Sequence, residues 1–120
     1  MSVDPILPIS PTLPLVPAKD PADALMKKML DAVKAASYED FIADGTPRMK
    51  AGGKGAFGVA SAHFAPLLLK GYKTTYLTRL RKLDHAVSLW KLEPAGASED
   101  YEIRVVLQLK DGKVDDFRIQ

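Results

Sequence analysis

The sequence predicts an α+β fold, in which three N-terminal helices pack on a four-stranded antiparallel sheet. Between residues 20 and 70, apolar side chains recur with the spacing of amphipathic helices. From residue 72 onward, segments rich in Thr, Tyr, Val and Leu alternate apolar with polar residues, as strands do. Helices that precede the strands, instead of alternating with them, are typical of α+β domains whose helices lie on one face of the sheet.

Composition limits the classes of protein to which the chain can belong. Its 120 residues suffice for one domain with a hydrophobic core. With 17 basic and 15 acidic residues, its charge is too balanced to suggest a nucleic-acid partner. The lack of cysteine excludes disulfides, thiolate catalysis and Cys-ligated metals. No apolar run approaches the ~20 residues of a membrane helix, and the N-terminus does not resemble a secretory signal. We therefore expect a cytoplasmic protein that does not contact membranes.

Residues 1–19 form a proline-rich arm ahead of a domain that spans residues 20–120. In "PILPISPTLPLVP" (5–17) a proline occupies every third position. Polyproline II has three residues per turn, so the prolines would share one edge of a rod roughly 37 Å long. The segment could be a mobile tail, an arm that docks on its own domain or on a sister subunit, or a ligand for a proline-binding module. We expect the docked arm, because it would cover the aliphatic side chains between the prolines.

The helices are predicted from their capping residues and apolar stripes. The first runs from about residue 21 to 36, with Asp20 as N-cap and Pro21 at the first helical position. Ser37 caps a short second helix, "YEDFIAD", which Gly45 ends. The glycine-rich stretch 45–55 is predicted to be a loop. A third helix covers residues 54–70 and bends at Pro66.

Four strands are predicted at residues 72–82, 86–93, 101–109 and 113–120. The last hairpin is best explained by a three-residue turn at 110–112 with Gly112 left-handed, because Val105 then faces Phe117 and Ile103 faces Ile119. The opposite face of these two strands would carry a mixed set of side chains, namely Arg104, Val106, Gln108, Val114, Asp116 and Arg118.

Three segments, "APLLLKGYKTTYL", "SLWKLE" and "LKDGKVDDFRIQ", together with "ASYEDFIADGT" after the first helix, resemble a family. They are similar to small uncharacterised bacterial members of the nuclear transport factor 2-like, or cystatin-like, superfamily. The resemblance covers about residues 20–120 and implies a curved sheet that wraps the helices into a cone, a pocket between them, and dimers. No catalytic set of that superfamily maps onto matching positions of this chain.

Candidate catalytic residues are few. His63 could point into the pocket as a general base, although a histidine at a helix boundary more often has no catalytic role. His85 falls in a predicted turn, and neither histidine belongs to a metal-binding spacing. Asp115 and Asp116 are adjacent on a strand, so they should point to opposite faces. Arg79 and Arg81 share a strand face and could bind an anion, or form cross-strand ion pairs.

The residues expected to line the pocket are Tyr38, Phe57, His63, Tyr76 and Trp90. Aromatic side chains with a polar atom suit small-ligand sites, and they suit core packing equally well. We expect a small-molecule-binding domain, without cofactor or metal, that forms a homodimer. Two alternatives are an isomerase, lyase or hydrolase that uses His63, and a protein-interaction module that uses the arm or the outer sheet face.

Overall fold

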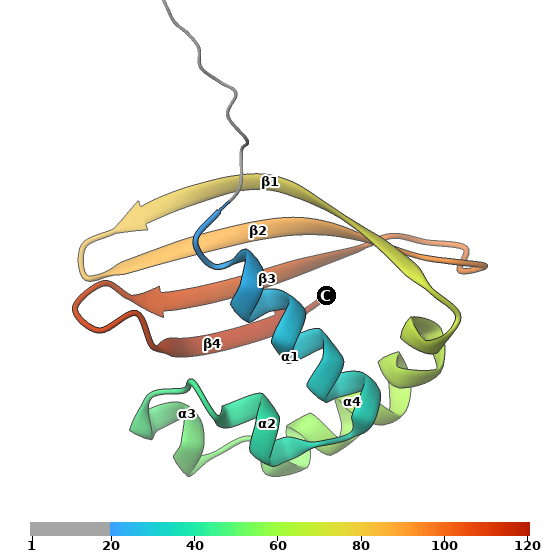
Figure 1. Cartoon of the computed structure of the whole chain (residues 1–120), viewed down its shortest axis with the longest axis horizontal. Coiled ribbons are helices and arrows are strands. Elements are labelled where there is room, and N and C mark those ends of the chain that lie inside the picture. Colours follow the sequence, from blue (N-terminus) through green and yellow to red (C-terminus); the bar gives the residue numbers. More distant parts are fainter. Residues whose placement is uncertain (1–19) are drawn as a thin grey trace, which may run out of the picture.

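The computed structural model of the chain describes residues 20–120, and the proline-rich arm lies outside the described residues. Within this range the helices are α1 (Asp23–Ala35), α2 (Tyr38–Ile42), α3 (Pro47–Ala51) and α4 (Lys54–Leu69). The strands are β1 (Tyr72–Lys82), β2 (His85–Pro94), β3 (Tyr101–Gln108) and β4 (Val114–Ile119). They form one antiparallel sheet in chain order, β1-β2-β3-β4 (Figure 1). The predicted α+β class is confirmed.

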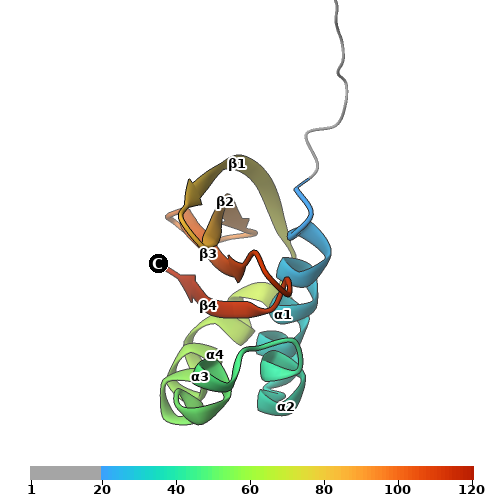
Figure 2. The same cartoon turned by 90° about the vertical axis from the view of Figure 1, so that its left-hand side faces the viewer.

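Helix α1 crosses one face of the sheet. Helices α2 and α3 lie beside β4, and α4 runs from there toward the start of β1 (Figure 1). The sheet curls around α1 instead of lying flat (Figure 2). The hydrophobic core lies in this concave space, where the apolar stripe of α1 meets α4 and the central strands. Its fully buried side chains include Met26, Leu30, Leu68, Trp90 and Ile103.

The first helix begins two residues later than predicted, and Asp20 has a different role. Ala22 is the residue that precedes helical geometry, and the Asp20 carboxylate accepts a hydrogen bond from the Ala22 N–H at 2.7 Å. The Asp20 side chain is also fully buried. It therefore anchors the start of α1 to the sheet instead of acting as a solvent-exposed cap.

Helix α3 corrects the prediction of a loop over residues 45–55. Thr46 accepts a hydrogen bond from the Met49 N–H, and Pro47 occupies the first turn. Both are ordinary start signals of a helix. The glycines that follow Pro47 favour a loop in the sequence, and residues 20–120 therefore contain four helices where three are predicted.

The last hairpin keeps the predicted pairing of Val105 with Phe117 and of Ile103 with Ile119. Gly112 is left-handed, with φ +70°. The register nevertheless shifts between Val106 and Leu107, so that Asp115 is an extra residue and Leu107 pairs with Val114. This bulge places Val114 in the core, whereas the prediction put it on the outer face.

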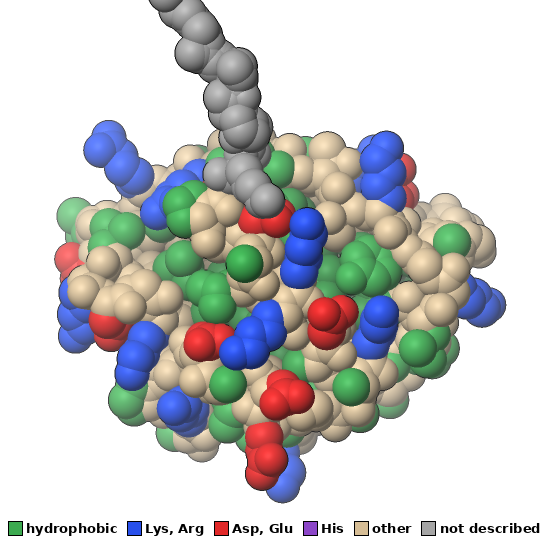
Figure 3. Space-filling model, viewed as in Figure 1, with side chains coloured by type: hydrophobic (Ala, Val, Ile, Leu, Met, Phe, Trp, Pro, Cys, Tyr) green, Lys and Arg blue, Asp and Glu red, His purple; other side chains and the backbone are tan. Residues whose placement is uncertain are grey.

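The face of the molecule that carries α1 has a mixed charge. Basic and acidic side chains are interspersed on it (Figure 3). One such pair, Lys28 with Asp44 at 2.7 Å, ties α1 to the segment before α3. No helix within residues 20–120 is long and apolar enough to cross a membrane.

Candidate functional site

A cavity of about 440 Å³ lies between the helices and the edge strand β4. Its walls come from the end of α1, from α2 and α3, from the first half of α4, and from residues 115–120. These elements lie next to one another at the side of the fold where β4 approaches the short helices (Figure 2). The volume falls in the range of ~300–1,000 Å³ that small-molecule sites occupy.

Aromatic side chains from three elements form one wall of this cavity. Phe57 of α4 packs against Phe41 of α2, with 4.7 Å between ring centroids, and against Tyr38 at 5.5 Å. Phe41 in turn meets Phe117 of β4 edge-on at 5.4 Å. Tyr38 and Phe41 can share this wall because residues three apart lie on one face of a helix. The result is an apolar surface that joins the helices to the sheet.

The other end of the cavity is charged, and Asp115 is its centre. Its carboxylate accepts hydrogen bonds from Thr46 Oγ1 at 2.9 Å and from Arg48 Nη1 at 2.8 Å. His85 Nε2 lies 3.5 Å from the same carboxylate. The bulge in β4 makes this cluster possible, because the extra residue turns Asp115 toward α3.

The segment before α3 is held to the start of β4 by backbone contacts. Gly45 forms a parallel bridge with Val114, and the Thr46 N–H donates to the Val114 carbonyl at 2.8 Å. A Cβ at Gly45 would lie 2.9 Å from Met49 Sδ and 3.1 Å from the Ile42 carbonyl oxygen, so a larger residue would force the Met49 side chain to move. At the far end of α3, the Tyr38 hydroxyl donates to the Gly52 carbonyl at 3.0 Å. Helix α3 is therefore fixed at both ends along the cavity.

The structure separates the residues that were expected to line one pocket. Tyr38 and Phe57 line the cavity. Tyr76 and Trp90 lie instead in the core on the concave face, where their rings meet at 6.1 Å. His63 is exposed on α4, packed edge-on against Phe64, and lines neither this cavity nor a second hollow of about 500 Å³ beside α4. The exposed position removes the reason for proposing His63 as a base.

Sequence reasoning missed Arg48 and Asp115, which contribute the charged end. Arg48 falls in the predicted loop, and for Asp115 the sequence predicts only that it points away from the face of Asp116. The Thr46-Pro47 start signal could have revealed α3 and therefore Arg48. No local signal indicates that the bulge would fall at Asp115.

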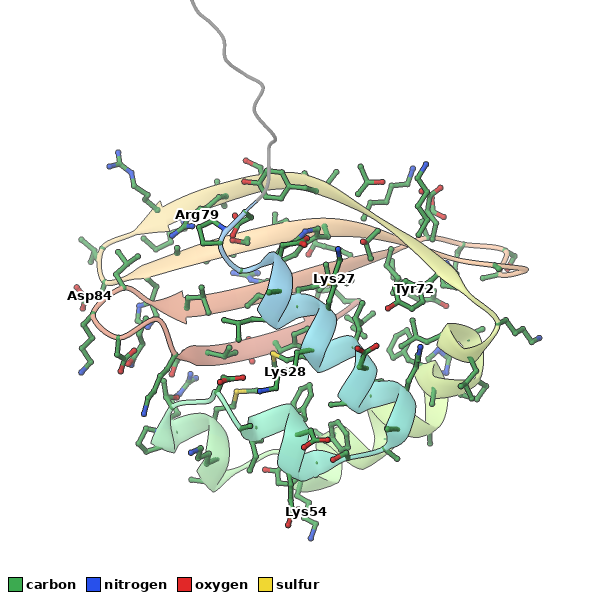
Figure 4. All side chains as sticks on the ribbon, viewed as in Figure 1. Lys27, Lys28, Lys54, Tyr72, Arg79 and Asp84 are labelled. Atoms are coloured by element: carbon green, nitrogen blue, oxygen red, sulfur yellow. The ribbon has the colours of Figure 1, made fainter. Side chains whose placement is uncertain are left out.

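A second polar cluster surrounds Asp20, on the concave face of β1 and β2. Ser88 Oγ donates to Asp20 Oδ2 at 2.8 Å, and Arg79 Nη1 lies 3.7 Å from Oδ1. Arg79 therefore forms an ion pair with a residue that precedes α1, and not the cross-strand ion pair that was expected, beside the point where the described chain begins (Figure 4). Neither cavity is lined by these residues. The cluster is therefore an anchor and not part of the candidate site.

Two tyrosines on β1 should make the fold less stable at alkaline pH. Burial raises the pKa of the Tyr72 and Tyr76 hydroxyls above the ordinary 10.0, and the Asp20 carboxylate raises that of Tyr76 further. As the pH rises, the unfolded chain loses the two hydroxyl protons before the folded chain does. The stability that these protonated tyrosines contribute is therefore complete below pH 10.0, and it is lost as the pH rises through their raised folded-state pKa values. We expect urea midpoints to fall above pH 10.0 less steeply in Tyr72→Phe/Tyr76→Phe than in the wild type. Equal slopes would contradict this origin.

The fold and the cavity define a small α+β domain whose curved sheet cups its helices. No family model and no curated protein match the chain. A solved structure described as a SnoaL-like polyketide cyclase from Jannaschia sp. CCS1 matches with 13% identity and a TM-score of 0.37, over 87% of this chain and 90% of that chain. No ligand or residue role is transferred from that protein.

Proposed function

We propose that the protein binds an apolar or amphipathic small molecule in the cavity beside β4. The observation that supports this most strongly is the cavity itself, which combines about 440 Å³ with an aromatic wall and one charged end. Small-ligand sites commonly have this form, in which apolar walls supply affinity and a few polar groups fix orientation. An apolar ligand body would lie against Phe57 and Phe117.

The charges of the cavity favour a ligand without a strong net charge. Arg48 pairs with Asp115 at 2.8 Å, and Arg118 pairs with Asp116 at 2.9 Å. Each guanidinium thus already faces a carboxylate, so the four groups sum to zero. An anion would meet the negative charge of a carboxylate beside each arginine, which opposes its binding. A neutral polar group can hydrogen-bond at the rim without this repulsion.

Binding is better supported than catalysis at this cavity. The alternative enzyme, an isomerase, lyase or hydrolase, was built on His63, and that side chain is exposed outside the cavity. Asp115 reaches the cavity wall, but its carboxylate accepts bonds from Thr46 and Arg48. These two contacts hold the carboxylate against α3 through both of its oxygens, as expected of a group that fixes the cavity wall and not of a free base.

The neutral fluorescent dye Nile red tests the proposal. We expect saturable binding to the wild type, with a rise in fluorescence as the dye leaves water. Ala56 is exposed in the first turn of α4 and lines the cavity. In Ala56→Trp the indole would occupy cavity space, so the dissociation constant should rise at least about tenfold, which is 1.4 kcal/mol.

The matched control is Val59→Trp, on the same helix. Val59 is 74% exposed and lines neither cavity, so the same large side chain there should leave dye binding unchanged. Circular dichroism of both variants establishes that the helix content is retained. Equal affinity in the wild type and Ala56→Trp, or no saturable binding to the wild type, would contradict a ligand site in this cavity.

We further propose that the protein is a homodimer, as the sequence resemblance implies, and that it is cytoplasmic, as expected from its composition. Light scattering coupled to size-exclusion chromatography measures the oligomeric state directly. A monomer at micromolar concentration would contradict the dimer and leave the ligand proposal unaffected, because all residues of the cavity come from one chain.

A further inference from the structure

The outer edge of β4 carries backbone groups that lack a strand partner. Glu102 and Gln120 exchange both backbone hydrogen bonds, at 2.6 and 2.9 Å. Hydrogen-bonded and non-hydrogen-bonded pairs alternate along an antiparallel ladder. The N–H and C=O groups of Arg118, two residues before Gln120, therefore also point toward β3, whereas those of Phe117 and Ile119 point away from β3. In the part of the chain that the structure describes, the bridge between Gly45 and Val114 is the only pairing on that outer side.

The cavity runs along this same edge. Every residue from 115 to 120 lines it, including residues from both faces of the strand, as expected for a space beside the edge of a strand. The peptide groups of Phe117 and Ile119 therefore face an apolar cavity next to their own apolar side chains. Such an edge can accept an added strand, which takes up the main-chain hydrogen bonds and places alternate side chains in the cavity.

An added strand must meet a simple requirement at this edge. It needs backbone N–H groups at two positions that are two residues apart, opposite Phe117 and Ile119. In residues 5–17 the prolines recur every third position, so only pairs that flank a proline meet this requirement. The flanking pairs are residues 7 and 9, 10 and 12, and 13 and 15.

Side-chain chemistry narrows the choice to two tripeptides. Residues directly opposite each other on paired strands place their side chains on the same face. Partners of Phe117 and Ile119 would therefore point into the concave apolar face. Leu7 with Ile9, and Leu13 with Leu15, are aliphatic at both positions, whereas residues 10 and 12 are Ser and Thr.

The distance that the chain must cover favours the first tripeptide. Asp20 is anchored at β1 and β2 by Arg79 and Ser88. Strands lie about 4.8 Å apart, so the far side of β4 is roughly 14 Å from β2 even along a direct path. Five residues from Leu15 to Asp20 span at most about 17 Å, which allows almost no detour. Eleven residues from Ile9 to Asp20 span up to about 36 Å, which allows a path around α1.

We propose that Leu7-Pro8-Ile9 of the same chain pairs with β4 as a fifth strand and fills part of the cavity. The tether raises the local concentration of this segment to the millimolar range, which favours its own domain over a second copy. The inference goes beyond the proposed small-molecule function and does not require it, although both occupants would use the same space. An added strand would also shield an exposed sheet edge from pairing with other chains.

Amide hydrogen exchange of the full chain, followed by NMR, tests this directly. The N–H groups of Phe117 and Ile119 should exchange at least about tenfold more slowly than unstructured amides, because the added strand accepts their hydrogen bonds. In Leu7→Pro/Ile9→Pro the segment loses both N–H donors, so this protection should fall about tenfold or more. The Gln120 amide, which bonds to Glu102, should be unaffected.

The matched control is Leu13→Pro/Leu15→Pro, which adds the same number of prolines and should preserve the protection. Loss in this control alone would overturn the assignment to residues 7–9. Unprotected Phe117 and Ile119 amides in the wild type, or protection that persists in Leu7→Pro/Ile9→Pro, would overturn strand addition. Protection that is lost on tenfold dilution would overturn the intramolecular arrangement. None of these measurements uses an added ligand, so they fail or succeed independently of the dye experiment.

Discussion

Replacing Asp20 by alanine should lower the free energy of unfolding by about 3 kcal/mol. The Asp20 carboxylate is fully buried and accepts hydrogen bonds from Ser88 Oγ and from the Ala22 N–H, with the Arg79 guanidinium 3.7 Å away. The substitution removes all three interactions at once. It leaves a buried hydroxyl and a half-buried positive charge without their partner, and this desolvation cost exceeds the value of the lost hydrogen bonds alone.

Urea unfolding followed by far-ultraviolet circular dichroism measures this effect. Asp20→Asn should fall between the wild type and Asp20→Ala, because the amide oxygen can still accept from Ala22 but no longer balances Arg79. Asp31→Ala is the matched control: it removes an exposed carboxylate from α1, 4.0 Å from Lys34, and should cost less than about 0.5 kcal/mol. A loss at Asp20 no larger than at Asp31 would mean that the carboxylate is not an anchor.

Helices and strands with a strong apolar periodicity were predictable from the sequence, and so was part of the register between β3 and β4. The apolar stripe of α1 and the alternation of β3 leave little choice of face, because a shift of one residue in a strand would expose its whole apolar set. This is why the pairing of Val105 with Phe117 could be inferred. The same argument failed two residues away, since the bulge at Asp115 changes the face of Val114.

The candidate site was less predictable because tertiary contacts between distant segments build it. Val114 bonds to Asp44 and to Thr46, about 70 positions earlier in the chain, and the bulge lies directly beside this contact. Tyr38 and Phe57 could be predicted to line the cavity, because the apolar pattern of their helices shows which face is buried. Tyr76 and Trp90 have the same chemical character, and only the packing of α1 over the sheet assigns them to the core.

Trp90→Ala should have the largest effect on stability, lowering the free energy of unfolding by about 4 kcal/mol. Trp90 is 1% exposed at the centre of β2 and contacts Tyr76 edge-on at 6.1 Å. Truncation would leave a cavity beneath α1 that its neighbours, on paired strands, can fill only in part. Because Trp90 is the only tryptophan of the chain, unfolding must be followed by circular dichroism and not by tryptophan fluorescence.

Trp90→Phe separates the packing of this side chain from its polar atom. Among residues 20–120, the buried indole Nε1 has no hydrogen-bond partner. An unpaired buried N–H costs about 1–3 kcal/mol, so removing it should offset much of the packing lost with the smaller ring. We expect Trp90→Phe to cost less than about 1.5 kcal/mol, well below Trp90→Ala. Equal losses of unfolding free energy in the two variants would mean that the indole N–H is hydrogen-bonded in solution. This hydrogen bond, and not packing alone, would then stabilise the centre of the sheet.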